Sequence, residues 1–472
     1  MYLIEKNKKI NLQASLFIAL LIISLGVIGS LYAKILLLGI VVIIGLFLSL
    51  VNWKAILCIG LAGILIVPFG KYEFFNLKIP YVNVDVFTLL LYFIFSVIIM
   101  KYVVDKQSMG IKFDVNYSLL ISIIFIYTLI GFFKSNTFVV AEFKVYLFYI
   151  VYPLSLCLFY KSKDALKLLL KLSIVSCFLL SCLVVFMYFF KSTIFYEFFD
   201  GSFYTEGTRV AVSNLSIFII CMPIFMVALV LRVLNSYWNM FILITIPLMA
   251  VSSIMGESRT LMGAIAVNML LVFLLIPFVI SKRQLGSWVK VSLLFSCVFV
   301  LAIIALNFVS LGDKLLVAFE RFSEIITTGT ADSYQTRNMT NEYTLELIKE
   351  NLLGYGVGSG MWLYNSVGIP VQEGYFIDNG FLTILFKFGV PGILIFMIFY
   401  FKNIFNVLKC YRDNKRSSHG IVALMILICL PVYFFSGLYM SAQLVANGTI
   451  FGFLLMIFAF YKTYMSKNQA IK

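Results

Sequence analysis

Long apolar runs separated by short charged segments dominate the hydropathy pattern of this chain. A bilayer core ~30 Å thick requires about 20 apolar residues of α-helix. Runs of about that length follow one another almost from end to end, near residues 13–31, 35–52, 55–69, 84–103, 116–133, 141–160, 167–190, 212–231, 238–256, 261–280, 289–309, 379–401, 420–440 and 446–462. The pattern predicts an all-α, polytopic integral membrane helical bundle with about 12–14 transmembrane helices.

Composition supports the membrane assignment and narrows the function. Of the 472 residues, 62% are hydrophobic and 12% are charged, whereas a soluble domain is roughly 45–50% apolar and about 25% charged. A soluble fold of this size cannot bury so much additional apolar surface. The composition therefore excludes a secreted, nuclear or cytosolic enzyme.

The formal net charge of +15 comes from Lys and Arg residues that flank the apolar runs instead of gathering in a soluble domain. Cytoplasmic loops of membrane proteins carry such an excess of Lys and Arg. The charge pattern predicts cytoplasmic N- and C-termini, and we expect no nucleic acid partner. Because His419 is the only histidine and lies in a basic segment, we also expect no metal site and no cofactor.

The polar segments divide the chain into three parts. Residues 1–309 are predicted to form a transmembrane bundle, 310–378 one large extracytoplasmic loop, and 379–472 the C-terminal spans and a cytoplasmic tail. A loop of that length is usually functional or has structure of its own. Between Asn338 and Lys349 the apolar residues lie close to helical spacing, and Gly354 follows as a stop signal. The loop is therefore predicted to contain an amphipathic helix.

Arginines outside the membrane depart from the expected distribution of charge. Four of them are predicted to lie outside or at the outer membrane edge: Arg209, Arg259, Arg321 and Arg337. The planar guanidinium suits bidentate recognition of phosphate or carboxylate, so these residues indicate an anionic ligand. The alternative is local pairing, because Arg321 is flanked by Glu320 and Glu324, and Arg259 lies near Glu257.

Glycines and aromatic residues concentrate in the second half of the loop. The stretch from Gly354 to Gly360 is interpreted as a compact turn in which the backbone at Gly356 and Gly358 approaches an anion. Its context does not fit a nucleotide-binding loop, which needs a preceding strand and a following helix. Three aromatic residues are candidates for stacking on sugar rings, or alternatively for packing the loop onto the bundle: Trp362, Tyr364 and Tyr375.

Asp378 and Asn379 lie where the long loop returns to the membrane. If the bundle is compact, they are expected at the same depth as Arg259 and Arg337. An Asp-Asn pair before an apolar run is also typical of a helix N-cap. The two roles are compatible.

These motifs occur in a fixed order: Ser258-Arg259, Arg337, Gly354-x-Gly356-x-Gly358, Asp378-Asn379 and Phe388-Gly389-x-x-Gly392. The series resembles the O-antigen ligase and polymerase superfamily. The resemblance implies transfer of a saccharide from undecaprenyl pyrophosphate at the outer face of the bacterial inner membrane. It places Arg259 and Arg337 on the family's pyrophosphate-contacting arginines. Asp378 falls where ligases have histidine, which favours a polymerase.

The resulting hypothesis is a polysaccharide polymerase that transfers a growing glycan to a lipid-linked repeat unit without a metal. Arg337 and Arg259 are expected to stabilise the leaving pyrophosphate, and Asp378, or second Glu373, to act as the base. The remaining candidates are expected to bind substrate: Arg209, Arg321, Asn379, Tyr375, Gly356, Gly358, Trp362 and Tyr364.

The expected partners are the undecaprenyl pyrophosphate-linked oligosaccharide, membrane lipid and, as a further candidate, a chain-length regulator protein. The alternatives are a ligase acting on lipid A core or on protein, a lipid-linked oligosaccharide flippase and a non-catalytic scaffold. A flippase is less favoured because such transporters are often built from related halves. The two halves of this chain show no obvious similarity.

Overall fold

The computed structural model describes residues 54–55, 57–63, 65–66, 76–79, 82–85, 114–189, 204–205, 209–210, 213–256, 259–282, 284–293, 332–365, 367–438 and 448–471. The predicted spans at 13–31 and 35–52 lie outside these residues, as do most of 84–103 and 289–309. The chain divides into two compact units, one made of Met1–Ile56 and Phe75–Val104 and the other of Leu57–Phe74 and Asp105–Lys472. In the first unit, strands β1 (Asn76–Ile79) and β2 (Val82–Asp85) form an antiparallel hairpin.

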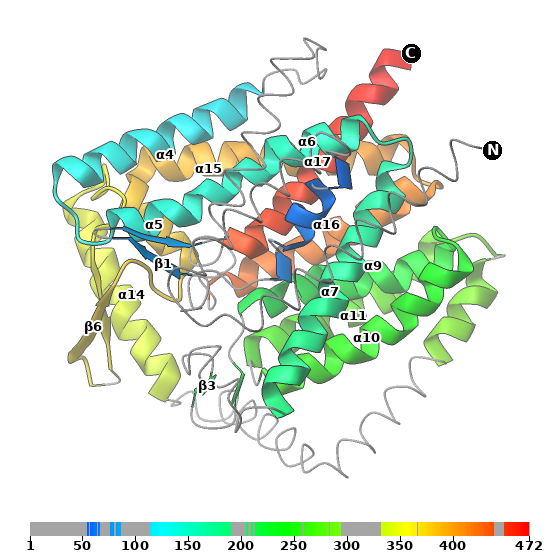
Figure 1. The fold of residues 1–472 in the computed structure, drawn as a ribbon, viewed down its shortest axis with the longest axis horizontal. Coiled ribbons are helices and arrows are strands. Elements are labelled where there is room, and N and C mark those ends of the chain that lie inside the picture. The colour runs from blue at the N-terminus through cyan, green and yellow to red at the C-terminus, as the bar shows by residue number, and fades with distance from the viewer. Residues whose placement is uncertain are drawn as a thin grey trace. The chain divides into compact units, whose positions relative to one another are not determined.

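The second unit is built mainly of helices (Figure 1). Its main helices are α4 (Val115–Phe133), α5 (Val139–Tyr146) continuing through η2 (Leu147–Ile150) into α6 (Val151–Tyr160), α7 (Ala165–Phe189), η4 (Ser213–Ile217) continuing into α9 (Phe218–Leu231), α10 (Ser236–Met255), α11 (Arg259–Val279), α15 (Gly380–Asp413), α16 (Ser418–Ser436) and α17 (Gly448–Ile471). Within the described residues, 8 helical segments are long and apolar enough to cross a membrane. The prediction of an all-α, multi-pass membrane protein is confirmed, and the total of 12–14 spans stays a prediction.

Helix α9 lies at the centre of one group of packed helices. It contacts α7, α10, α11 and α16, and every one of its residues is buried, as expected for a helix that is apolar on all sides. Pro223 inside it cannot donate to the carbonyl of Ile219. The Nδ2 of Asn268 on α11 donates to that carbonyl at 3.0 Å instead. The proline is therefore accommodated without an unpaired backbone group.

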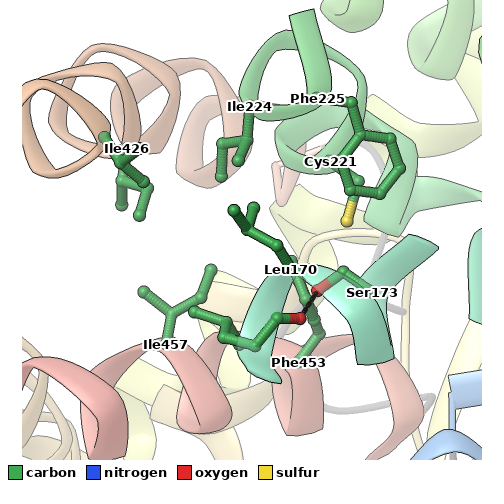
Figure 2. Close-up of a pocket in the computed structure, with 10 residues that line it drawn as sticks. Leu170, Ser173, Cys221, Ile224, Phe225, Ile426, Phe453 and Ile457 are labelled. Atoms are coloured by element: carbon green, nitrogen blue, oxygen red, sulfur yellow. Dashed lines mark hydrogen bonds between the residues drawn. The ribbon is translucent and has the colours of Figure 1, made fainter. Parts of the chain in front are cut away.

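Apolar side chains fill the space between α7, α9, α16 and α17. Figure 2 shows Leu170, Cys221, Ile426 and Ile457 pointing toward one another from these four helices. The Oγ of Ser173 donates back to its own helix at the carbonyl of Leu169. The lining offers no free charged group, so this region serves packing.

Polar side chains connect a second group of helices. The hydroxyl groups of Tyr149 and Tyr400 lie 3.1 Å apart. The single hydroxyl proton of Tyr152 is shared between Oδ2 of Asp114 at 3.0 Å and Oδ1 of Asn403 at 3.2 Å. Asp114, the N-cap of α4, also forms an ion pair with Lys462 of α17. Burial alone would raise the pKa of Asp114, but the hydrogen bonds and charge of Lys462, together with Tyr152, lower it on balance. These contacts tie α4, α6, α15 and α17 together.

A cap formed by α14 (Asp332–Glu350) and the antiparallel strands β5 (Met361–Tyr364) and β6 (Pro370–Gly374) lies between α11 and α15 in the sequence. Figure 1 shows α14 beside this hairpin, and α14 contacts both β5 and α15. The helix predicted over 338–349 is present and begins earlier, at Asp332. A separate two-residue ladder joins β3 (Tyr204–Thr205) to β4 (Arg209–Val210).

Helix α15 is interrupted at Gly389, whose φ of 60° and ψ of −168° are not helical. Pro391 follows two residues later and has no N–H to donate to the carbonyl of Lys387. The N–H of Val390 donates to the carbonyl of Leu352 at 2.9 Å. It therefore does not make the helical hydrogen bond to the carbonyl of Phe386. The break therefore frees two carbonyls of α15, and their new partners lie in the cap.

Candidate functional site

The glycine turn, residues 354–360, supplies the partners for the interrupted helix. The N–H groups of Tyr355 and Gly356 donate to the carbonyls of Phe386 and Lys387, each at 2.9 Å. Both freed carbonyls are thus satisfied, as buried backbone groups in a membrane must be. The turn is a structural joint between the cap and α15.

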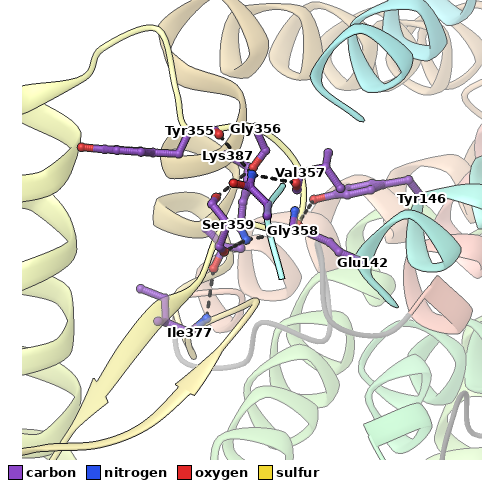
Figure 3. A network of polar contacts seen from close by, with 11 residues as sticks. Glu142, Tyr146, Tyr355, Gly356, Val357, Gly358, Ser359, Ile377 and Lys387 are labelled. Carbon is purple, nitrogen blue, oxygen red and sulfur yellow. Dashed lines mark hydrogen bonds and ion pairs between the residues drawn. The ribbon is translucent and has the colours of Figure 1, made fainter. Parts of the chain in front are cut away.

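A charged pair lies beneath this joint. Lys387 of α15 and Glu142 of α5 are 0% and 1% exposed, and Nζ lies 3.0 Å from Oε2. The same Oε2 accepts the N–H of Gly358 at 2.5 Å, and Oε1 accepts the hydroxyl of Tyr146 at 2.9 Å. Lys387 also donates to the carbonyl of Ser359. Figure 3 shows these groups converging on the glycine turn.

The expected role of Gly356 and Gly358 changes with this geometry. Their N–H groups are engaged by Lys387 and Glu142, respectively. The anion that the turn approaches is therefore the carboxylate of Glu142, a group of the protein itself. Substrate contact through these two N–H groups stays a prediction that the observed hydrogen bonds do not favour.

A second charged pair lies at the surface of the cap. The Nε of Arg337 on α14 donates to Oδ2 of Asp378 at 2.7 Å, and the two side chains are 35% and 51% exposed. Within the described part of the chain, neither side chain makes another hydrogen bond. The two Nη atoms of Arg337 and Oδ1 of Asp378 are thus available to a ligand. This pair is the candidate functional site.

Asn379 follows Asp378 and begins α15. Its Oδ1 accepts the N–H groups of Phe381 and Leu382, each at 3.1 Å. Such bonds satisfy donors that the first turn of a helix leaves unpaired. The N-cap interpretation of Asn379 is confirmed, and its contact with substrate stays a prediction.

Tyr375 precedes Asp378 by three residues and packs against two aromatic rings. Its ring packs on Phe138, with centroids 6.0 Å apart, and on Phe376 at 5.0 Å. Burial, reinforced by the charge of Glu142, raises the pKa of Tyr375 to about 12. The hydroxyl is therefore protonated at neutral pH and can donate a hydrogen bond.

The other candidates on the hairpin have separate surroundings. Trp362 and Glu373 are cross-strand partners; Trp362 is 40% exposed, and Glu373 lies against Gly360. The ring of Tyr364 packs on Tyr343 of α14 at 4.9 Å. Packing onto the cap thus accounts for Tyr364, whereas Trp362 keeps an exposed face.

The structure describes two of the three remaining arginines. Arg259 is the first residue of α11, Arg209 lies in β4, and Arg321 lies outside the described residues. The catalytic role expected of Arg259 and the substrate binding expected of Arg209 and Arg321 stay predictions.

The pair of Glu142 and Lys387 was not among the residues selected from the sequence. The signal available was a charged residue inside each of two apolar runs, and ionisable residues within membrane spans mark functional positions. The hairpin was also missed, since neither strand has a long alternating pattern.

Together, the apolar helices, the interrupted α15 and the charged cap define a multi-pass membrane protein with a polar site carried by one long loop. Residues 244–397 match the family model for O-antigen ligase. The predicted resemblance to the O-antigen ligase and polymerase superfamily is confirmed for this segment. It includes both members of the surface pair and covers roughly a third of the chain. Neither a curated protein nor a solved structure matches the chain.

Proposed function

We propose that this protein is a polysaccharide polymerase. It transfers a growing glycan from undecaprenyl pyrophosphate to a lipid-linked repeat unit in O-antigen, capsule or exopolysaccharide synthesis. The observation that carries the proposal is the exposed pair of Arg337 and Asp378 inside the O-antigen ligase domain. An enzyme of this superfamily needs a cation for the leaving pyrophosphate and an acceptor for a hydroxyl proton, and this pair offers both.

The reaction assigned to the pair is a substitution at the anomeric carbon of the donor sugar. A hydroxyl oxygen of the acceptor forms the new bond while the bond to pyrophosphate breaks, and the leaving oxygen takes the electron pair. Arg337 binds the charge that develops there, because an interaction that strengthens in the transition state lowers the barrier. Asp378 takes the hydroxyl proton, and its bond to Nε of Arg337 directs the two Nη atoms toward the pyrophosphate.

The distribution of Lys and Arg supports cytoplasmic termini and a cap on the external face. In this proposal the protein resides in the bacterial inner membrane, where lipid-linked repeat units are its substrates. A chain-length regulator protein is the partner expected of a polymerase. A ligase is the second candidate, because the matching family model describes O-antigen ligases.

The test is a reconstitution of the full chain in lipid vesicles with a lipid-linked repeat unit as donor and acceptor, with products separated on a gel. A ladder of glycan lengths is expected. A charge-assisted hydrogen bond contributes ~1.5–3 kcal/mol, so Arg337→Ala is expected to slow the ladder roughly ten- to a hundred-fold. Lys167→Ala, which removes another exposed ion pair, at 3.2 Å from Asp164, is the matched control and should retain the rate.

One outcome would contradict the polymerase, and another would contradict only the role of Asp378. A repeat unit that is consumed only after lipid A core is added would identify a ligase. A general base contributes about a hundred-fold or more, so full turnover by Asp378→Asn would remove Asp378 from the proton transfer while leaving the polymerase intact.

A further inference from the structure

The ion pair between Glu142 and Lys387 calls for an explanation beyond stability. Its two side chains come from α5 and α15 and are almost completely buried. Replacing a buried ion pair with apolar residues of similar volume is often neutral or stabilising, because both charges must be stripped of water. A well-packed apolar contact between these helices would hold them together equally well. The presence of two buried charges is therefore explained better by their contacts with the backbone of Gly358 and Ser359.

Both charges bind the backbone of the cap. The carboxylate of Glu142 accepts the N–H of Gly358, and the ammonium of Lys387 donates to the carbonyl of Ser359. Adjacent residues of one turn thus supply a hydrogen-bond donor to the carboxylate of Glu142 and an acceptor to the ammonium of Lys387. An apolar pair would satisfy neither group.

The turn connects directly to the surface pair. Strand β5 begins at Met361, just after Ser359. Met361 belongs to one buried apolar cluster with Ile377, which precedes Asp378, and with Phe386, which precedes Lys387. The cluster also contains Ile348 of α14, the helix that carries Arg337. A shift of the glycine turn would therefore move both members of the surface pair.

We propose that Glu142 and Lys387 are positioning residues for the glycosyl transfer. They hold the glycine turn in the register that places Arg337 and Asp378 against the substrate, and this assignment rests on the proposed function. Neither residue touches the substrate. A misplacement of about 1 Å at a reacting group costs on the order of a hundred-fold in rate, so the effect belongs in kcat.

Two double variants separate positioning from folding. Glu142→Leu with Lys387→Met, the apolar variant, removes the charges and both backbone contacts. Glu142→Gln with Lys387→Gln, the amide variant, removes the charges but keeps an acceptor for Gly358 and a donor for Ser359. Tyr149→Phe with Tyr400→Phe is the matched control, because it removes another buried polar pair at 3.1 Å that involves α15 and does not touch the turn.

The ladder assay is run over a range of repeat-unit concentrations. The apolar variant is expected to lose kcat about a hundred-fold with KM within about twofold of the wild type, since the binding groups are intact. The amide variant and the tyrosine control should stay within about fivefold of wild-type kcat. Hydrogen exchange in residues 354–365 should rise in the apolar variant alone.

Each contrary result has a distinct meaning. A wild-type kcat in both the apolar and the amide variant, with a wild-type ladder present, overturns the positioning role alone. Equal loss in both variants assigns the effect to the charges and likewise overturns it. A wild-type protein that forms no ladder overturns the proposed function, and the exchange data then report only whether the pair holds the turn.

Discussion

Replacing Glu142 with Gln isolates the electrostatic part of the buried pair. The substitution keeps the size of the side chain and one acceptor oxygen, which can serve Gly358, and its NH2 group can donate to the hydroxyl of Tyr146. It leaves Lys387 without a counter-charge in a site that is 0% exposed. Breaking a buried ion pair from one side costs about 3–5 kcal/mol, because an uncompensated charge remains. We therefore expect Glu142→Gln to lower the free energy of unfolding by about that amount.

The second substitution should restore most of this loss. In Glu142→Gln with Lys387→Gln no charge is buried, and the amides can still pair with each other and with the turn. The double variant is expected within about 1 kcal/mol of the wild type, so adding Lys387→Gln to Glu142→Gln should recover about 2–4 kcal/mol of the free energy of unfolding. Asp164→Asn is the matched control, because its partner Lys167 is 50% exposed and exposed pairs contribute about 0–1 kcal/mol.

The measurement is equilibrium unfolding of purified protein in mild detergent micelles, followed by intrinsic fluorescence. Two results would refute the reasoning. A loss below about 1 kcal/mol for Glu142→Gln would mean that the pair is not desolvated. A double variant as unstable as the single one would mean that the cost comes from the amide at position 142 and not from the charge of Lys387.

Three further predictions concern Gly358, Asp114 and Tyr375. Gly358→Ala should sharply lower the yield of folded protein in size-exclusion chromatography, because the φ of Gly358 is +78° and a Cβ there would lie 2.1 Å from the backbone of α5. Gly263→Ala is the control and should fold normally, since a Cβ at Gly263 would have nothing within 4 Å. The pKa of Asp114 is lowered from 3.8, so its ionised form stabilises the fold above that pH, and the stability difference between wild type and Asp114→Asn should shrink as the pH falls below 3.8. A pKa of about 12 for Tyr375 keeps its hydroxyl protonated up to about pH 10, so Tyr375→Phe should leave the pH–rate profile between about pH 7 and 10 unchanged in shape; a lost alkaline limb would contradict this.

Apolar length determines which helices can be predicted from the sequence. The runs at 116–133, 167–190 and 238–256 correspond to α4, α7 and α10 within a few residues. The end of a helix is predicted less well where the helix continues into polar residues. The run at 379–401 ends well before the last residue of α15. That helix continues to Asp413 through polar residues such as Lys402 and Asn403. Backbone hydrogen bonding extends a helix beyond its apolar part, so hydropathy marks the span and not the helix end.

The two charged pairs differ in how far the sequence could identify them. Arg337 and Asp378 flank the same loop segment, so their common depth followed from topology, and they form an ion pair at 2.7 Å. Glu142 and Lys387 are each visible as a charge in an apolar run, and each must find a partner in a membrane. Periodicity and hydropathy give the depth of such a residue but not which helices are neighbours. The break at Gly389 brings the two residues to a common partner, the glycine turn. Two freed carbonyls of α15 accept hydrogen bonds from the turn, and the backbone of the turn then lies against both charges. A glycine-rich turn in a loop and a Gly-x-Pro inside a nearby span are therefore better read together, as two sides of one joint, than as separate motifs.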